Sequence, residues 1–459
     1  IFTILNSYIL VINLKYENNL DSEFYVDTIS NSQKFGNEMH ELMAKLFPIC
    51  RSITGDGVRK SLSILKNHID LEIIEVKSGT QVFDWTIPKE WNITDAYIKN
   101  SKGEKIVDFQ KSNLHVLNYS IPINNKMNLD KLKSHLFTNP NQPDLIPYLT
   151  TYYNEKWGFC LSHNQFLKLK EDEYEVFIDS TLEIGSLTYG EYFKKGKLDD
   201  EIVITCYICH PSMCNDNLSG TVIATFLAKI LSNIETRYSY RFLFIPETIG
   251  AITWLSKNES KLKNIKHGLV ITCAGDSGNL TYKKSRKGDH EIDKAVQNVL
   301  KNSSSDYNIE DFFPSGSDER QFCSPAFDLP FGSLMRTRYG KFSEYHTSAD
   351  NLNFVKAEFL ADTFSKYIEV FLVLENNLKF KNLNPKCEPQ LGKRGLYRLI
   401  GGQKDNDAGI DELALFWVLN QSDGKNSLLD ISNKSNLSFI KIKNSADVLL
   451  KANLLEMIN

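Results

Sequence analysis

Three segments of the chain carry side chains that could hold a metal ion. CHPSMCNDNLSG contains His210 and Asp216, PETIGA contains Glu247, and EYHTSAD contains His346. Imidazole nitrogens and carboxylate oxygens are the ligands that zinc takes in catalytic sites, where one coordination position stays open for water. A carboxylate that lies beside the metal can act as general base on that water, and we assign this role to Glu247. Asp350, four residues after His346, could orient an imidazole. The residue types therefore predict metal-assisted hydrolysis.

Each of these residues also has an ordinary interpretation. A single His after a strand is usually a polar residue with a hydrogen-bond partner, and Asp216 could cap the helix that follows it. Glu247 could cap a helix in the same way. What favours a metal site is the place of all three segments in the predicted fold.

Apolar runs of about six residues alternate with helices in this part of the chain. The strands IVITCY (202–207) and RFLFIP (241–246) precede helices predicted near 217–232 and 250–261, and GLVITC follows. This alternation predicts a three-layer α/β/α domain with a mostly parallel sheet. Ligands of such domains bind at the carboxyl ends of the strands. We therefore expect His210 and Glu247, which follow two of these strands, to lie at the same edge of the sheet.

The rest of the chain divides around this α/β domain, which we assign to residues 35–80 and 173–380. Between the two parts, residues 81–172 contain short apolar runs and turns that indicate an inserted β-rich domain. Residues 384–459 contain three short helical patterns, which suggest a winged-helix module. Residues 1–34 are an N-terminal extension, whose first 14 residues lack a basic leader and are too short to span a bilayer.

Composition excludes several classes of protein. The chain has 459 residues, of which 42% are hydrophobic and 24% charged, with a formal net charge of −4. This composition lacks the excess of basic residues that would favour binding to nucleic acid or to membranes. Its eight cysteines form no regular framework, which indicates a reducing compartment, and we expect a cytoplasmic protein. Cys206 and Cys209 have C-x-x-C spacing but no second such pair, so a redox or structural zinc role is not expected.

Several long strings resemble a known family. They are PICRSITGDGVR, GTQVFDWTIPKEWNI, DAYIKNS, VDFQKSNLHVLNYS, WGFCLSHNQ, GSLTYGEY, CHPSMCNDNLSG, PETIGA, GSDERQF and EYHTSADNL. The chain resembles, over residues 37–455, the aminopeptidase-like proteins often encoded with bacterial polysaccharide and surface-glycan genes. The resemblance implies a zinc-aminopeptidase-like fold with an inserted β domain and a C-terminal winged helix.

The wider zinc aminopeptidase superfamily implies a role for each matching residue. His210 resembles its first metal-binding His, and Asp216 resembles the Asp that bridges two zinc ions. Glu247 resembles the general base, and His346 resembles the last metal-binding His.

The chain departs from that pattern at two ligand positions. The second Glu of the superfamily falls on Thr248, and its next Asp ligand falls near Thr272 and Cys273. Asp276 is displaced from this position, and Asp318 and Glu319 are the candidate substitutes. We therefore expect one zinc ion or a remodelled pair, with Glu247 acting as base or as ligand.

Basic and aromatic residues beside these segments are candidates for substrate binding. Arg51, Arg320 and Tyr345 suggest a carboxylate-bearing or otherwise anionic substrate, because the planar guanidinium group binds carboxylates through two hydrogen bonds. Trp85 and Trp91 in the insertion are expected to be core residues rather than a wall of the site.

The C-terminal module has almost no net charge. Residues 384–459 contain ten Lys and Arg against nine Asp and Glu, and only Lys441 and Lys443 are close together. A DNA-binding module usually shows a basic face, so nucleic acid is an improbable partner and a role in homo-oligomer contacts is favoured.

Three hypotheses for function follow. The first is a zinc aminopeptidase or amidohydrolase that acts on a small peptide or another amide-bearing substrate, in surface polysaccharide or glycoconjugate metabolism. The second is a non-hydrolytic relative, either an acyl-transfer enzyme of the cyclase kind or a pseudoenzyme, which Thr248 keeps open. The third is a DNA-binding regulator that senses a ligand.

Overall fold

The computed structural model describes residues 20–396 and 411–458, so the first 14 residues discussed above lie outside the described part. The chain divides into two compact units. One unit comprises residues 33–288 and 308–364, and the other takes the remaining described residues. Each unit is described separately below.

A mixed sheet of eight strands lies at the centre of the larger unit. In spatial order its strands are β1 (Glu72–Lys77), β10 (Ser186–Lys194), β12 (Ser239–Ile245), β11 (Glu201–Tyr207), β13 (Ile265–Ile271), β16 (Phe331–Met335), β14 (Leu280–Lys283) and β15 (Tyr307–Glu310). The neighbours β12, β11, β13 and β16 are parallel, and antiparallel pairs lie towards the edges. The parallel centre confirms the predicted sheet.

Both faces of the sheet are covered. Every residue of β11 and β12 is buried, as expected for strands between two layers. On one face, Trp254 of α8 (Ile249–Asn258) and Phe322 of α10 (Glu319–Phe322) join the core that contains Phe331, whose ring stacks on Phe322 at 4.0 Å. The residues of β11 and β12 that point to the opposite face are buried as well. Helix α7 (Ser219–Leu231) packs against β11, β12 and β13.

The remaining helical elements of this unit precede β1 or follow β12. They are α3 (Ser32–Leu46), α4 (Asp56–Leu65) and the short η3 (Glu259–Asn264). The boundary between the two units falls within α11 (Ala357–Asn376). Within the described residues, no helix is long and apolar enough to cross a membrane.

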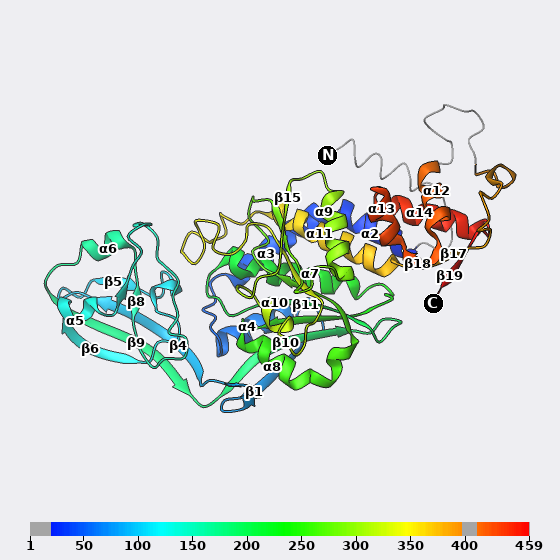
Figure 1. Ribbon diagram of the computed structural model, residues 1–459. Helices are drawn as coiled ribbons and strands as arrows, with labels where there is room; N and C mark the ends of the chain where they lie inside the picture. Colours follow the sequence, from blue (N-terminus) through cyan, green and yellow to red (C-terminus); the bar gives the residue numbers. More distant parts are fainter. Residues whose placement is uncertain (1–19, 397–410, 459) are drawn as a thin grey trace. The chain divides into compact units, whose positions relative to one another are not determined.

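The insertion is an antiparallel sheet with its own core. Its strands, light blue to green in Figure 1, have the order β5 (Lys105–Asp108), β4 (Glu90–Lys99), β9 (Glu173–Glu183) and β6 (Ile123–Asn128). The smaller elements are β2 (Gln81–Val82), β3 (Trp85–Thr86), η1 (Asn113–His115), α5 (Leu129–Lys133), β7 (Leu136–Phe137), β8 (Phe159–Cys160) and α6 (His163–Leu167).

The two tryptophans of the insertion have different environments. Trp91 is 2% exposed and its indole N–H donates to the carbonyl of Ser120 at 2.7 Å, so its predicted place in the core is confirmed. Trp85 is 39% exposed, and the prediction that it belongs to the core is wrong. The reason is that Trp85 lies on the two-residue strand β3 of a small hairpin, outside the main sheet of the insertion.

The smaller unit contains the winged helix. The three predicted helices are α12 (Glu412–Gln421), α13 (Leu428–Ser435) and α14 (Phe439–Lys451), and a sheet that the sequence did not predict joins β18 (Asp423–Ser427), β17 (Lys379–Asn382) and β19 (Leu455–Ile458). The same unit holds α2 (Leu20–Ser30), α9 (Glu291–Lys301) and η4 (Leu391–Arg394).

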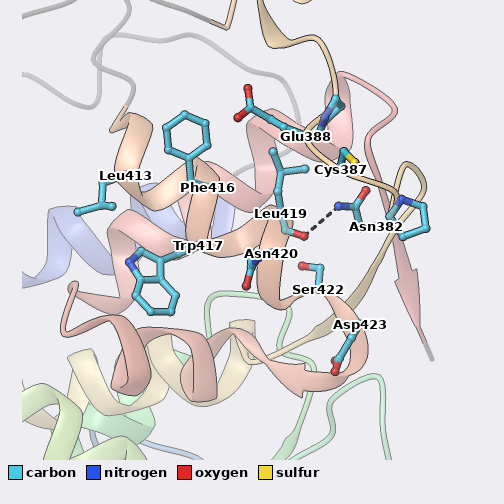
Figure 2. Close-up of a pocket in the computed structure, with 12 residues that line it drawn as sticks. Asn382, Cys387, Glu388, Leu413, Phe416, Trp417, Leu419, Asn420, Ser422 and Asp423 are labelled. Carbon is cyan, nitrogen blue, oxygen red and sulfur yellow. Dashed lines mark hydrogen bonds between the residues drawn. The ribbon is translucent and has the colours of Figure 1, made fainter.

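One apolar residue of α12 is exposed to solvent. Leu415, Val418 and Leu419 are buried, but Leu413 is 56% exposed. Figure 2 shows Leu413 beside a pocket of about 770 Å³ that Phe416 also lines, where Asn382 donates to the carbonyl of Leu419 at 2.9 Å.

Candidate metal centre

The ends of two neighbouring strands place the first residues of the site. β11 ends at Tyr207 and β12 ends at Ile245, so His210 and Glu247 enter at the same edge of the sheet. Asp216 lies in the kinked helical segment Cys214–Leu218 that leads into α7. His346 comes from the loop between β16 and α11, more than a hundred residues further along the chain.

His210, Asp216 and His346 meet in a small space. Their ligand atoms all lie within 4.8 Å of one another, and no other group of three such residues was found in the described parts of the chain. Nε2 of His346 lies 2.9 Å, and Nε2 of His210 4.0 Å, from Oδ2 of Asp216. Glu247 flanks the group, with Oε2 3.9 Å from Nε2 of His210.

The chemistry of these three residues fits a zinc ion. Oδ2 of Asp216 and Nε2 of His346 are buried and lie 2.9 Å apart, and neither atom has any other hydrogen-bond partner within the described structure. Burial lowers the pKa of His210 to about 4, so its imidazole is neutral and keeps a lone pair for a metal. Burial alone would raise the pKa of Asp216, but His210 and His346 outweigh it and lower that pKa to about 2. A neutral imidazole and an ionised carboxylate are the forms that bind metals.

Tyr207 occupies the other oxygen of this carboxylate. Its hydroxyl group donates a short hydrogen bond to Oδ1 of Asp216 and lies 2.7 Å from Oγ1 of Thr272. Burial raises the pKa of Tyr207 well above its usual value, so the hydroxyl group keeps its proton. Asp216 therefore has one oxygen, Oδ2, free for a metal. Sequence reasoning missed Tyr207, although its place at the carboxyl end of β11 could have indicated it.

Glu247 lies in surroundings that favour proton uptake. Burial, followed by the negative charges of Asp318 and Asp216, raises the pKa of the Glu247 carboxyl group well above its usual value. Its main-chain N–H donates to the thiol sulfur of Cys209 at 3.3 Å, which fixes the start of the loop. A carboxylate that accepts a proton readily beside a metal site is suited to act as a base.

The two less certain metal candidates have other partners. Glu319 and Lys283 form an ion pair of 2.6 Å in which both side chains are fully buried. Asp318 accepts a hydrogen bond from the main-chain N–H of Thr248 at 2.7 Å, and burial raises its pKa to about 7. Arg320 donates to the hydroxyl group of Thr248 at 2.8 Å. These residues surround Thr248 and are not part of the group of three ligands.

Asp350 and Asp276 hold the loop that carries Asp216. The carboxylate of Asp350 accepts the main-chain N–H groups of Asn215 at 2.6 Å and Asp216 at 3.0 Å. We expected Asp350 to orient an imidazole, and its hydrogen bonds go to the main chain instead. Asp276 accepts a hydrogen bond from the side chain of Asn215 at 2.8 Å.

Arg51 and Tyr345 contact the two histidines. Arg51 is buried, and its Nε donates to the carbonyl of His210 at 2.9 Å while Nη1 donates to that of Leu46 at 2.6 Å. Its Nη2 has no partner within the described structure. The ring of Tyr345 stacks on that of His346 at 4.0 Å and 11°. Both arrangements stabilise the metal-binding side chains, and substrate binding by these residues stays a prediction.

The insertion contributes a residue that the sequence did not indicate. The ring of Tyr148 packs edge-on against His210 at 5.2 Å and His346 at 5.1 Å, and its main-chain N–H donates to the carbonyl of His346 at 2.8 Å. Ser348 N–H donates to the carbonyl of Ile146 at 2.9 Å beside it. No motif surrounds Tyr148, so only the folded structure reveals this contact.

Comparison with known proteins agrees with this architecture. Residues 40–377 match the family described as "Domain of unknown function (DUF4910)", and residues 379–457 match a winged helix-turn-helix family. A protein of Clostridium acetobutylicum, named as a candidate polysaccharide biosynthesis protein with an aminopeptidase-like domain, is 61% identical over 430 residues, which are 94% of this chain and 98% of the relative.

Solved structures show the same fold. A candidate peptidase from Clostridium acetobutylicum has a TM-score of 0.90 and 59% identity, covering 94% of this chain and 99% of that one. BSAP, a zinc aminopeptidase from Bacillus subtilis, has a TM-score of 0.54 and 13% identity, covering 73% and 93%. A peptidase M28 precursor from Shewanella amazonensis has a TM-score of 0.53 and 13% identity, covering 77% and 96%. The family resemblance found in the sequence is thereby confirmed, and the chain belongs to the DUF4910 family of aminopeptidase-like proteins with a C-terminal winged helix.

Proposed function

We propose that this protein is a zinc-dependent hydrolase that cleaves an amide bond in a small peptide or another amide-bearing substrate. The observation that carries the proposal is the group of His210, Asp216 and His346, whose ligand atoms lie within 4.8 Å of one another. Two of these atoms, Oδ2 of Asp216 and Nε2 of His346, are buried and have no hydrogen-bond partner in the described structure except each other, and a metal ion would satisfy both.

Zinc at this position would act as a Lewis acid that polarises the carbonyl group of the substrate. It would also lower the pKa of a bound water molecule. Glu247 takes the proton of the attacking water and returns it to the nitrogen of the departing amine. Its raised pKa supports both steps, because the carboxyl group must bind the proton and then release it. The rings of Tyr148 and Tyr345 pack against the imidazoles and keep them in place.

The hydrogen bond from Tyr207 favours one zinc ion per chain. A carboxylate that bridges two ions needs both of its oxygens, and Oδ1 of Asp216 is already an acceptor for Tyr207. The side chains nearest to this oxygen include Thr272, which offers a hydroxyl group rather than a second carboxylate. We therefore assign to this protein a site with one metal ion, in which Glu247 remains free to act as base.

The relative's name suggests a setting for this activity. Because that protein is named for polysaccharide biosynthesis, we infer a substrate from glycoconjugate metabolism. All eight cysteines lie among the described residues and are free thiols, which supports a reducing, cytoplasmic environment.

Metal analysis of the purified protein tests the proposal. We expect about one zinc ion per chain, and His210→Ala and His346→Ala should each lose most of it, because one of three protein ligands is removed. His163→Ala, which removes a His in α6 that bonds to Thr138, is the matched control and should keep its zinc. Full zinc content in both ligand variants would show that the site is wrongly placed.

A substrate screen then separates hydrolysis from the alternatives. Amino-acyl amides and N-acylated amino sugars should be hydrolysed by the zinc-loaded protein and not after removal of the metal. Transfer of the acyl group to an acceptor other than water, or cyclisation, would identify a non-hydrolytic relative instead.

A further inference from the structure

A small aromatic pocket lies between the hairpin β2–β3 and the turn at Tyr152 and Tyr153. Its volume is about 280 Å³. Trp85, Tyr119 and Tyr153 form its aromatic side, with ring centroids 6.2 Å apart for both Trp85–Tyr153 and Tyr153–Tyr119. Lys89 and Glu155 form its charged edge and pair with each other at 2.7 Å.

The hairpin presents its aromatic side chains to solvent. Val82 and Ile87 are buried in the core beneath the central sheet, which anchors the hairpin. Between them, Phe83 is 46% and Trp85 39% exposed. Trp85 is therefore not part of the hydrophobic core, and exposed aromatic residues that lie close together are typical of a binding surface.

The turn on the other side of the pocket is strained. Tyr152 and Tyr153 have φ angles of 46° and 69°, in the left-handed region that bulky residues rarely adopt. Such residues concentrate at ligand sites, where the surrounding structure holds them in place. Tyr152 is 66% exposed, and the hydroxyl group of Tyr153 makes no hydrogen bond to a described residue, so both are available to a ligand.

The pocket is within reach of the metal centre. Tyr153 follows Tyr148 by five residues, which span at most about 18 Å when fully extended, and Tyr148 packs against both metal-site histidines. Burial raises the pKa of Tyr152, and the next contribution comes from the charge of Glu247, as expected for groups at one cleft. A substrate bound at the metal centre could extend into this pocket.

We propose that the aromatic pocket is a subsite for one sugar ring of the substrate. A sugar ring has an apolar C–H face that packs on an aromatic ring and a hydroxyl edge that needs hydrogen bonds, and Trp85 and Tyr153 supply the first while Lys89 and Glu155 supply the second. The volume lies just below the lower limit of about 300 Å³ for drug-sized ligands, which suits a single ring. This inference rests on the proposed function and makes its substrate an amide-bearing glycoconjugate.

Sugar binding can be measured independently of hydrolysis. The full-length protein, both metal-stripped and zinc-loaded, is titrated calorimetrically with a panel of methyl glycosides of hexoses and N-acetylhexosamines, and separately with N-acetylphenylalanine amide. We expect at least one glycoside to bind equally to both forms, because the pocket contains no proposed metal ligand. A failure of zinc uptake would therefore overturn the proposed function and leave this measurement interpretable.

Variants then assign the binding to the pocket. Trp85→Ala should weaken glycoside binding about tenfold or more, Trp85→Phe should restore most of it, and the matched control Trp417→Ala in the winged helix should have no effect. No glycoside binding to either form, preferential binding of N-acetylphenylalanine amide, or unchanged affinity in Trp85→Ala would each overturn the sugar subsite. Unchanged zinc content in Trp85→Ala shows that the variant is folded.

Discussion

The hydroxyl group of Tyr207 donates a hydrogen bond to Oδ1 of Asp216, and the other carboxylate oxygen lies 2.9 Å from Nε2 of His346. Tyr207 thus fixes which oxygen of Asp216 is available to a metal. Groups that orient a ligand in this way commonly change metal affinity by about 10–100-fold when they are removed.

Tyr207→Phe should therefore weaken zinc binding by about 10–100-fold while the protein stays folded. Competition with a fluorescent chelator measures the affinity. Tyr174→Phe is the matched control, since it removes a tyrosine hydroxyl group that donates to the carbonyl of Lys170 in the insertion. If Tyr207→Phe bound a second zinc ion without losing affinity for the first, the hydrogen bond would be blocking a two-metal site.

Glu247→Gln should keep zinc and lose turnover by roughly 10²–10⁴-fold, the usual contribution of a positioned base. The amide cannot take up a proton, but its size preserves the packing around Cys209. Steady-state kinetics on a substrate from the screen, together with zinc analysis, give both quantities. A variant without zinc would identify Glu247 as a ligand, and normal turnover would remove it from the mechanism.

Glu90→Gln should destabilise the protein by about 1.5–3 kcal/mol at neutral pH, as for other hydrogen bonds to charged groups. Arg59 binds both oxygens of Glu90, at 2.6 and 2.7 Å, and this bond is the main reason why the pKa of Glu90 falls to about 2. Because the pKa of Glu90 is lower in the folded protein than its usual value of 4.5, the ionised carboxylate stabilises the fold at pH values above 4.5. This stabilisation is lost as the pH falls towards 2.

Urea unfolding at several pH values measures this dependence. The difference in unfolding free energy between wild type and Glu90→Gln should be full at pH 7 and shrink between pH 4.5 and 2. Glu155→Gln, whose partner Lys89 is 48% exposed, is a control that should change little at any pH. A constant difference across this range would contradict the assigned role of the ionised carboxylate.

The winged helix should bind duplex DNA weakly at physiological salt. Its two neighbouring lysines are already paired, Lys441 with Asp411 at 3.3 Å and Lys443 with Asp447 at 2.6 Å. The phosphate-driven affinity that depends on unpaired basic residues should therefore be small. A gel-shift titration of the full-length protein tests this, and submicromolar binding with a steep salt dependence would support the regulator hypothesis.

The parallel strands and the candidate site were predictable because they follow local rules. Continuous apolar runs such as IVITCY indicate strands buried on both faces, and the carboxyl ends of these strands indicate where ligands bind. His210 and Glu247 could be placed at the same sheet edge on this basis alone. The segment of His346 was placed at the same edge as well, although no predicted strand leads directly into it.

Other features depend on contacts that a local pattern does not encode. Trp85 was expected in the core because large aromatic residues are usually buried, but its hairpin is anchored by Val82 and Ile87 instead. Asp350 was expected to bind an imidazole, and the main chain of the kinked loop competes for its oxygens. Tyr148 approaches the histidines from the loop between β7 and β8 of the insertion, so no spacing in the sequence could reveal it.

The hydrogen bonds between Tyr148 and His346, and between Ile146 and Ser348, have a consequence for the modularity of this architecture. The insertion has its own sheet and core, so it has the features of a domain that could be exchanged between relatives. Its loop nevertheless supports the imidazole of His346, so a graft that replaces the whole insertion, β9 included, would also remove part of the scaffold of the metal site. Exchange of the insertion would preserve that scaffold only if the donor supplied a loop with the same main-chain pairing.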